Sequence, residues 1–110
     1  MDCEFRYRLT QNAERDIDEI LSYLTDSLSN PQAAANFMEH LQQTIDEACH
    51  FPKSGTPVEN EFLPSFSLRK KFIGHYVLYY LPENDEKTLY IVRVLYGKRD
   101  PDEILRELNL

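Results

Sequence analysis

Apolar residues follow two different periods along the first half of the chain. Residues 3–9 alternate apolar and polar side chains one by one, which is typical of a strand with one face in water. The apolar positions of this strand are Cys3, Phe5, Tyr7 and Leu9. From about residue 11 to 28, and from 31 to about 50, apolar residues recur every three or four positions, which predicts two amphipathic helices. Because only a couple of residues join them, we expect an antiparallel helical hairpin.

The second half of the chain has the pattern of a sheet. Residues 52–65 contain three prolines and the first glycine of the chain, which predicts a loop from the helices back to the strands. Three runs rich in β-branched and aromatic residues follow, at 66–72, 75–81 and 88–96. A polar turn at 83–87 joins the last two runs, which therefore form a hairpin.

The C-terminal segment DPDEILRELNL predicts a short helix that begins at Asp100 and Pro101. The predicted order of elements is therefore β-α-α-β-β-β-α. This order indicates an α+β fold of two layers, in which an antiparallel sheet of about four strands packs against the helical hairpin. A chain of 110 residues has the usual size of one domain, so we expect residues 1–110 to form a single domain.

Composition and charge narrow the classes of function. No run approaches the roughly 18 apolar residues that a membrane span requires. The charged N-terminus lacks the apolar stretch of a secretory signal, so we expect a cytoplasmic protein without a membrane partner. The net charge of −7 disfavours a general nucleic-acid binder, because phosphate binding depends on Lys and Arg. Residues 67–99 nevertheless hold seven bases and three acids, and we expect any anion contact in this basic block.

The candidate chemistry lies mainly in the basic block. His40, His50 and His75 share no ligand spacing and no cysteine pair accompanies them, so we expect neither a metal site nor a cofactor. His75 follows Gly74 and is the only side chain of the block that exchanges a proton near pH 7. Arg93 interrupts an otherwise apolar strand, where an arginine needs an anionic partner. That partner is either a ligand in an open groove or an acid of one of the helices.

Five segments, in this order, make up most of the chain: RLTQNAERDIDEILSYL, NPQAAANFMEHLQQTI, FPKSGTPVEN, LRKKFIGHYVLYY and IVRVLYGKRDPDEIL. Together they resemble the RelE/ParE superfamily of bacterial type II toxins, and more closely its ParE-like branch. The resemblance agrees with the order of elements predicted above. It implies a small toxin encoded beside an antitoxin, whose flexible segment folds along the toxin and silences it.

Two mechanisms occur in this superfamily. RelE-like toxins are endonucleases that cut messenger RNA on the ribosome, whereas ParE-like toxins inhibit DNA gyrase by protein contact. Arg99 matches an arginine of the nuclease pattern, but Tyr76 stands in place of a second arginine and Leu105 in place of a late aromatic residue. These departures, and a net charge that ribosomal RNA would repel, favour gyrase. The alternatives are a degenerate toxin that only binds its antitoxin and tunes operon repression, and an mRNA endonuclease that uses Arg99, His75, Arg93 and Tyr76.

Two binding surfaces are predicted from these patterns. The antitoxin should bind the helical hairpin and a sheet edge, because a sheet of four strands need not cover the apolar stripes fully. The stripe residues expected to contact it are Ile20, Leu24, Phe37 and Leu41. The target should bind the basic block and the C-terminal apolar stripe, at Arg69, Arg93, Lys98, Arg99, Ile104, Leu105 and Leu108.

Overall fold

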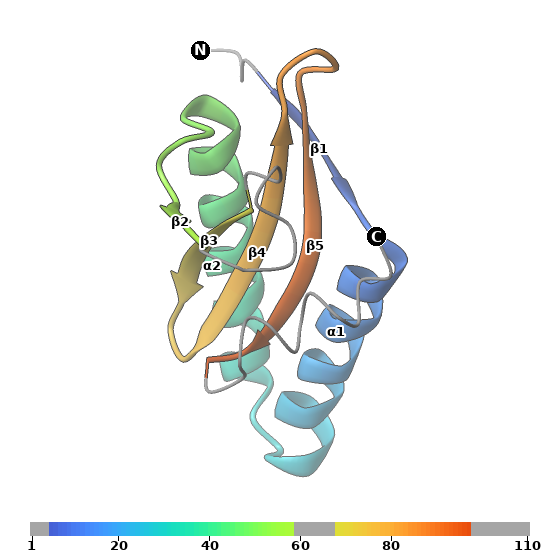
Figure 1. The fold of residues 1–110 in the computed structure, drawn as a ribbon. Coiled ribbons are helices and arrows are strands. Elements are labelled where there is room, and N and C mark those ends of the chain that lie inside the picture. Colours follow the sequence, from blue (N-terminus) through green and yellow to red (C-terminus); the bar gives the residue numbers. More distant parts are fainter. Residues whose placement is uncertain (1–4, 59–67, 98–110) are drawn as a thin grey trace.

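Two helices cover one face of a β-sheet in the computed structural model of the protein, which describes residues 5–58 and 68–97 (Figure 1). The first strand, β1 (Arg6–Leu9), leads into α1 (Gln11–Ser22), which continues as a short π-helix, η1 (Tyr23–Ser27). The second long helix is α2 (Pro31–His50). The later strands are β2 (Thr56–Pro57), β3 (Arg69–Ile73), β4 (Tyr76–Glu83) and β5 (Thr88–Tyr96).

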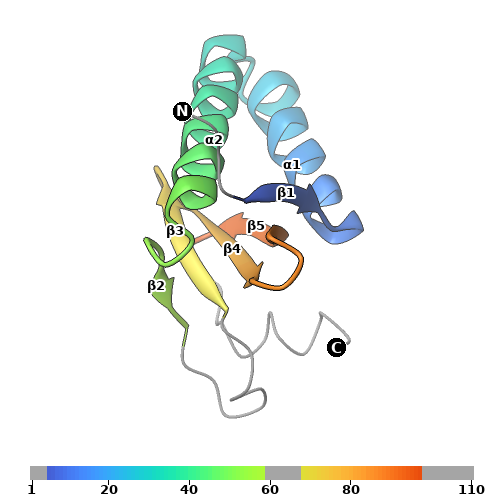
Figure 2. The ribbon, with the colours of Figure 1, turned by 90° about the horizontal axis from the view of Figure 1, so that it is seen from above.

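Both long helices begin at a side-chain cap. Thr10 Oγ1 accepts a hydrogen bond from the Ala13 N–H at 3.1 Å, and Asn30 Oδ1 accepts one from the Ala33 N–H at 3.0 Å. Figure 2 shows both helices on the same side of the sheet, where they meet at their connection and diverge from it. α1 packs on β5 and α2 packs on β3. The predicted helical hairpin is confirmed, with its two arms on different strands.

The described strands form one five-stranded sheet in the order β1-β5-β4-β3-β2. The predicted α+β fold of two layers is therefore confirmed, although two details of the sheet differ. The additional strand, β2, lies in the segment that we expected to be a loop, and it pairs with only two residues of β3. β1 runs parallel to β5, whereas the pairs β3–β4 and β4–β5 are antiparallel, so the sheet is mixed. The helix expected from Asp100 onward lies outside the described residues.

Apolar side chains are buried on both faces of the sheet. The larger cluster lies between the sheet and the helices and includes Ala13, Ala48, Leu78, Tyr80 and Ile91, all 0% exposed. A smaller cluster contains Val58, Leu68, Val77, Tyr79, Val92 and Leu95. The alternation predicted for the first strand holds only in part, since Phe5 is buried but Tyr7 is 41% exposed. Tyr7 lies on an edge strand with a single neighbour, so less of the fold covers it. Among the described residues, no helix is long and apolar enough to cross a membrane.

The hydroxyl of Tyr80 fastens the segment after α2 to the sheet. It donates a hydrogen bond to the Pro52 carbonyl at 2.8 Å and accepts one from the Gly55 N–H at 2.9 Å. Burial raises the pKa of the Tyr80 phenol, so the hydroxyl keeps the proton that it donates. A Cβ at residue 55 would lie 2.6 Å from the Tyr80 hydroxyl and 2.8 Å from the Lys70 carbonyl oxygen, so glycine is required there. This contact positions the start of β2 and the backbone carbonyls beside it.

Replacing Tyr80 by Phe should lower the free energy of unfolding by about 1–3 kcal/mol, because the buried Gly55 N–H loses its acceptor. Tyr90→Phe is the matched control, since the Tyr90 hydroxyl bonds at the surface with Glu86 at 3.0 Å. Urea unfolding of the two variants measures the difference. An equal loss of stability in both would show that the two buried hydrogen bonds of Tyr80 contribute nothing specific.

Candidate functional site

Helix α1 completes the open edge of β5. β1 pairs with β5 only between Thr88 and Ile91, and α1 lies beside the rest of the strand (Figure 1). There Asp16 Oδ2 accepts a hydrogen bond from the backbone N–H of Val94 at 3.0 Å. The guanidinium of Arg93 binds the same carboxylate twice, from Nε to Oδ2 at 2.7 Å and from Nη2 to Oδ1 at 3.0 Å. One carboxylate therefore caps the strand edge and neutralises the arginine.

Of the two partners that the sequence left open for Arg93, the structure shows the helix acid. Arg93 is 9% exposed and Asp16 is 6% exposed, so the pair is shielded from water. An arginine that is buried and bidentately paired does not reach a target protein or an RNA phosphate. The structure thus shows a structural role for Arg93, whereas its predicted contact with the target and its predicted part in catalysis stay predictions that this burial does not favour.

His75 and Tyr76 lie where β3 turns into β4. Gly74 adopts a φ of +60° in this turn, a conformation that glycine accepts without strain. His75 is exposed, whereas Tyr76 is half-buried at the start of β4. The Tyr76 ring packs edge-on against Phe37 of α2, with centroids 5.3 Å apart, and against Tyr96 of β5 at 6.0 Å. Tyr76 is thus held between a helix and the neighbouring strand.

A cavity of about 500 Å³ lies next to Tyr76, between α1 with η1 and the adjoining ends of β4 and β5. We call it the tyrosine groove; its lining includes Asp16, Glu19, Ile20, Tyr23, Tyr76 and Tyr96. Tyr23 is 51% exposed and Tyr96 is 52% exposed, while Tyr76 lies deeper. No Lys or Arg is among the described residues that line the groove. Because Asp16 is paired with Arg93, the unneutralised charge of the groove is that of Glu19.

The phenol of Tyr76 stays protonated at neutral pH. Burial raises its pKa above the ordinary value of 10.0, and the nearby Tyr23 and Tyr96 raise the pKa further. Tyr76 is therefore a hydrogen-bond donor and not a general base. A groove lined by tyrosines, with Glu19 as its unpaired carboxylate, suits a cation or a hydrogen-bonding group, and it disfavours a phosphate.

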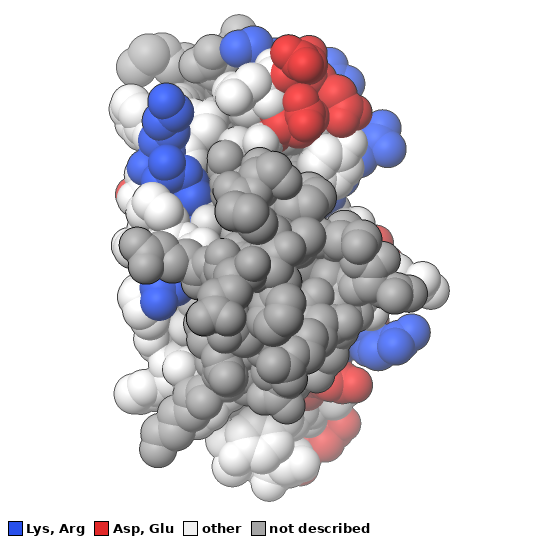
Figure 3. Space-filling view, in the orientation of Figure 1, with Lys and Arg blue, Asp and Glu red and all other residues white. Residues whose placement is uncertain are grey.

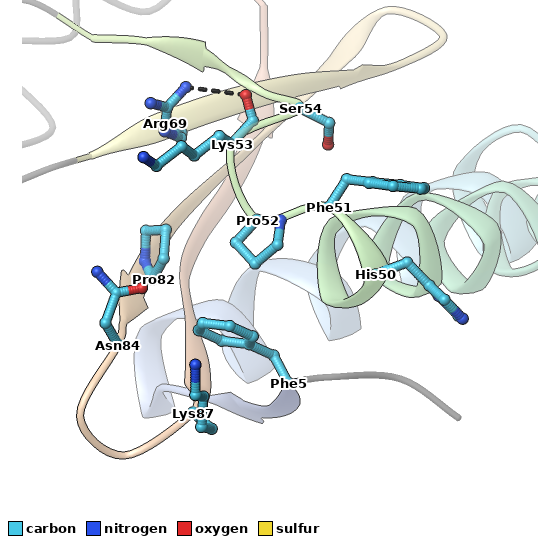
Figure 4. Close-up of a pocket in the computed structure, with 10 residues that line it drawn as sticks. All are labelled: Phe5, His50, Phe51, Pro52, Lys53, Ser54, Arg69, Pro82, Asn84 and Lys87. Carbon is cyan, nitrogen blue, oxygen red and sulfur yellow. Dashed lines mark hydrogen bonds between the residues drawn. The ribbon is translucent and has the colours of Figure 1, made fainter. Parts of the chain in front are cut away.

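A second cavity, of about 450 Å³, lies near the other end of β4, beside the segment after α2 (Figure 4). We call it the basic pocket, because its charged residues are Lys53, Arg69 and Lys87. Arg69 Nη1 donates hydrogen bonds to the carbonyl of Lys53 at 3.1 Å and to that of Gly55 at 2.6 Å. The guanidinium is therefore fixed by the same segment that Tyr80 holds.

The basic pocket has the charge for an anion but lacks a partner for proton transfer. Lys87 Nζ lies 5.2 Å from the centre of the Phe5 ring, a distance at which a cation is attracted to the ring face. His50 also belongs to the lining, but Figure 4 shows its ring directed away from Arg69 and Lys87. The pocket can attract a carboxylate or a phosphate. Its described residues do not place a proton-exchanging group beside that anion.

The structure does not gather the described residues of the basic block into one patch. Arg69 pairs with Tyr80 in the sheet, about 13 Å along β4 from Tyr76. In Figure 3, basic side chains lie at the upper left, over the segment before β2, and also at the top and on the right, while acidic ones lie at the upper right, near the β4–β5 turn, and at the lower right, along α1. Several predicted target contacts fall outside the described residues and stay predictions, namely Lys98, Arg99, Ile104, Leu105 and Leu108.

The four predicted antitoxin contacts belong to the core. Their exposed fractions are 9% for Ile20, 9% for Leu24, 6% for Phe37 and 4% for Leu41. The helical stripes are covered more fully than we expected, and of these four side chains Ile20 is the one that lines the tyrosine groove. Other apolar residues of the hairpin are exposed, including Tyr23 and Leu28, each 51% exposed, and Met38, 42% exposed. A contact of the antitoxin with the hairpin stays a prediction, and these exposed residues would make that contact.

The tyrosine groove was not predicted from the sequence. The spacing of Glu19 and Tyr23 places them on one face of the first helix, a signal that was available. The pairing of Tyr76 with Tyr96 depends on the register of β4 and β5, which the sequence pattern does not specify. Among the residues that the structure describes, no group of three or more His, Cys, Asp or Glu side chains could hold a metal ion.

Comparison with protein families gives one clear match. Residues 7–101 match the family described as the ParE toxin of the type II toxin–antitoxin system parDE. A search of curated proteins finds no match.

Solved structures of similar fold include proteins of three toxin–antitoxin systems. One is the chromosomal ParDE system of Pseudomonas aeruginosa, with 15% identity and a TM-score of 0.67 over 88% of this chain and 100% of that one. The RelBE2 complex of Mycobacterium tuberculosis has 22% identity and a TM-score of 0.58, over 84% of this chain and 96% of that one. The archaeal RelE–RelB complex of Pyrococcus horikoshii has 14% identity and a TM-score of 0.59, over 88% of this chain and 99% of that one. At these identities the likeness concerns the fold.

The contribution of the Asp16–Arg93 ion pair to stability can be tested by substitution. Asp16→Ala should lower the free energy of unfolding by about 3–5 kcal/mol, because Arg93 and the Val94 N–H then lack their buried partner. Replacing both charges, with Asp16→Leu and Arg93→Met, should recover part of this loss. Asp18→Ala, at an exposed position of the same helix, is the control and should change stability by less than about 0.5 kcal/mol. If urea unfolding finds Asp16→Ala as stable as the control, the pair does not hold α1 to the sheet.

Proposed function

The chain belongs to the ParE toxin family of type II toxin–antitoxin systems, and on that premise we propose that it inhibits DNA gyrase by protein contact. Gyrase is the target that the resemblance to the ParE-like branch implies. The alternative is the ribosome-dependent cleavage of messenger RNA. The two activities require different surfaces, since one recognises a protein and the other stabilises a phosphate in its transition state.

The surroundings of Tyr76 carry this proposal. Tyr76 occupies the position at which the nuclease pattern has an arginine, and its neighbours are Tyr23, Tyr96 and Glu19. Cleavage of RNA builds negative charge on phosphorus, and cations must offset that charge. A groove whose described lining has a carboxylate and no cation would repel the phosphate instead.

The positions of Arg93 and His75, the other nuclease candidates that the structure describes, support the same proposal; Arg99 lies outside the described residues. Arg93 is paired with Asp16 in the interior. Arg69 belongs to the basic pocket at a distance from His75 along the sheet. Neither Arg93 nor Arg69 therefore lies beside His75, where an RNA-cleaving site would need an arginine. Aromatic side chains that are half exposed, such as Tyr23 and Tyr96, are instead typical of protein interfaces.

Producing the chain alone in bacteria tests the target. We expect growth arrest with DNA breaks and intact messages, and we expect the purified chain to inhibit DNA supercoiling by gyrase. His75→Ala should change neither result by more than about twofold, because a general acid or base would contribute roughly 10²–10⁴-fold to a nuclease. Rapid cleavage of messages on ribosomes that His75→Ala abolishes would contradict the proposal and favour the endonuclease. Normal growth would favour a toxin that only binds its antitoxin.

We also propose that the antitoxin covers the outer side of the hairpin and an open edge of β3. Tyr23, Leu28 and Met38 form the exposed apolar surface of the helices. β2 pairs with only the first two residues of β3, so Lys71–Ile73 have no strand beyond them among the described residues. Phe72 in this stretch is 65% exposed. An amphipathic helix and an added strand are the two forms of peptide that such surfaces bind.

Hydrogen exchange of the chain with and without its antitoxin tests this surface. Binding should slow the exchange of backbone amides in residues 69–73, which a new strand would pair, and at the connection between the helices. The β4–β5 turn at residues 83–87 is the internal control and should exchange as before. Protection confined to the control turn, or absent from both proposed regions, would rule out this surface.

A further inference from the structure

The tyrosine groove has the chemistry of a site for a cationic side chain. Three phenol rings, those of Tyr23, Tyr76 and Tyr96, surround it with the carboxylate of Glu19. The Tyr76 ring is perpendicular to that of Tyr96, with an interplanar angle of 78°. In this arrangement the edge of one ring meets the face of the other, and the ring that presents its edge can offer a face to a third group. A cation is attracted to such faces, and the attraction grows when the rings are shielded from water.

The charges around the groove favour a cation over other ligands. Glu19 makes no ion pair within the described part of the chain. Asp18 and Asp26 line an adjoining hollow of the surface, in which Arg15 is the cation among the described lining residues. The whole chain has a net charge of −7. The described lining of the groove therefore carries negative charge and no cation, which favours Arg or Lys over phosphate as its ligand.

We propose that the tyrosine groove receives an arginine or lysine side chain of the antitoxin. The inference rests on the proposed function in one respect, namely that an antitoxin is the partner. The position of Tyr23 supports this choice of partner, because Tyr23 lines the groove and also belongs to the exposed apolar surface of the hairpin. An antitoxin segment that lies along the hairpin would thus bring its side chains to the mouth of the groove.

Occupation of the groove by a cation would place an antitoxin residue on Tyr76 and next to the turn that carries His75. Tyr76 is already immobilised by Phe37 and Tyr96, so little ordering of the toxin is needed on binding. On binding, the cation would lose its contacts with water and gain contacts with the ring faces and with the carboxylate of Glu19. The antitoxin would in this way cover the end of the sheet at which Tyr76 stands in place of an arginine of the nuclease pattern.

The affinity of the full chain for the protein encoded beside its gene tests the inference, with isothermal titration calorimetry as the measurement. Tyr96→Leu should weaken binding about 3- to 30-fold, because it removes a ring face, whereas Tyr96→Phe keeps the ring and should stay within about threefold of the unchanged protein. Glu19→Gln should weaken binding about two- to fivefold, and less so at high salt. Tyr7→Leu and Glu14→Gln are the matched controls, because both residues are exposed and neither lines the groove.

A double-mutant cycle identifies the cation. Each Arg and Lys of the antitoxin is changed to Gln in turn, and one of these changes should lose its effect when Tyr96→Leu is also present. Thermal unfolding of each toxin variant establishes that it is folded. If the unchanged chain binds the antitoxin and every groove variant binds as the controls do, the inference is wrong while the proposed function stands. If the unchanged chain binds no neighbouring protein, the antitoxin proposal fails and the inference fails with it.

Discussion

The carboxylate of Asp16 is the contact on which the two layers of the structure depend. It accepts a hydrogen bond from the N–H of Val94, where β1 no longer covers β5, and it accepts two more from Nε and Nη2 of the Arg93 guanidinium. A strand edge and a buried cation both need an anionic or polar partner, and one side chain of α1 supplies it. The position of α1 against β5 then determines where the tyrosine groove opens. The groove shares Asp16 with this contact, so the fold and the candidate site are coupled at one residue.

Charge is distributed unevenly over the described surface, and this distribution shapes the functional proposals. The basic pocket and its fixed Arg69 lie near one end of β4, while the acidic helix α1 and the tyrosine groove flank the other. A nuclease would need its cations at the end where Tyr76 and His75 lie. Among the described residues, the side chains that line the groove there are phenols, carboxylates and apolar groups. A protein partner can use both ends at once, since aromatic, acidic and basic side chains all contribute to protein interfaces.

Predictions from the sequence were accurate where local signals decide the structure. The two helical stripes and the β4–β5 hairpin depend on neighbouring residues, and both appear nearly as expected. The short strand β2 was missed, because it exists only through its pairing with Arg69 and Lys70. Ile20 and Leu24 were expected to remain available to a partner, whereas the sheet buries them. How far a sheet covers a helix depends on distances that no periodicity contains.

The sequence alone determined the class of fold, the family resemblance and the need of Arg93 for an anion. Periodicity and turn residues act over a few positions, so they are legible in a single chain. Only the tertiary structure decided that the anion is Asp16, 77 residues away in the chain, and that Tyr23, Tyr76 and Tyr96 border one groove. Those choices follow from strand register and from how the helices diverge across the sheet. Both are consequences of packing between segments distant in sequence, where many pairings are chemically possible and the fold selects one.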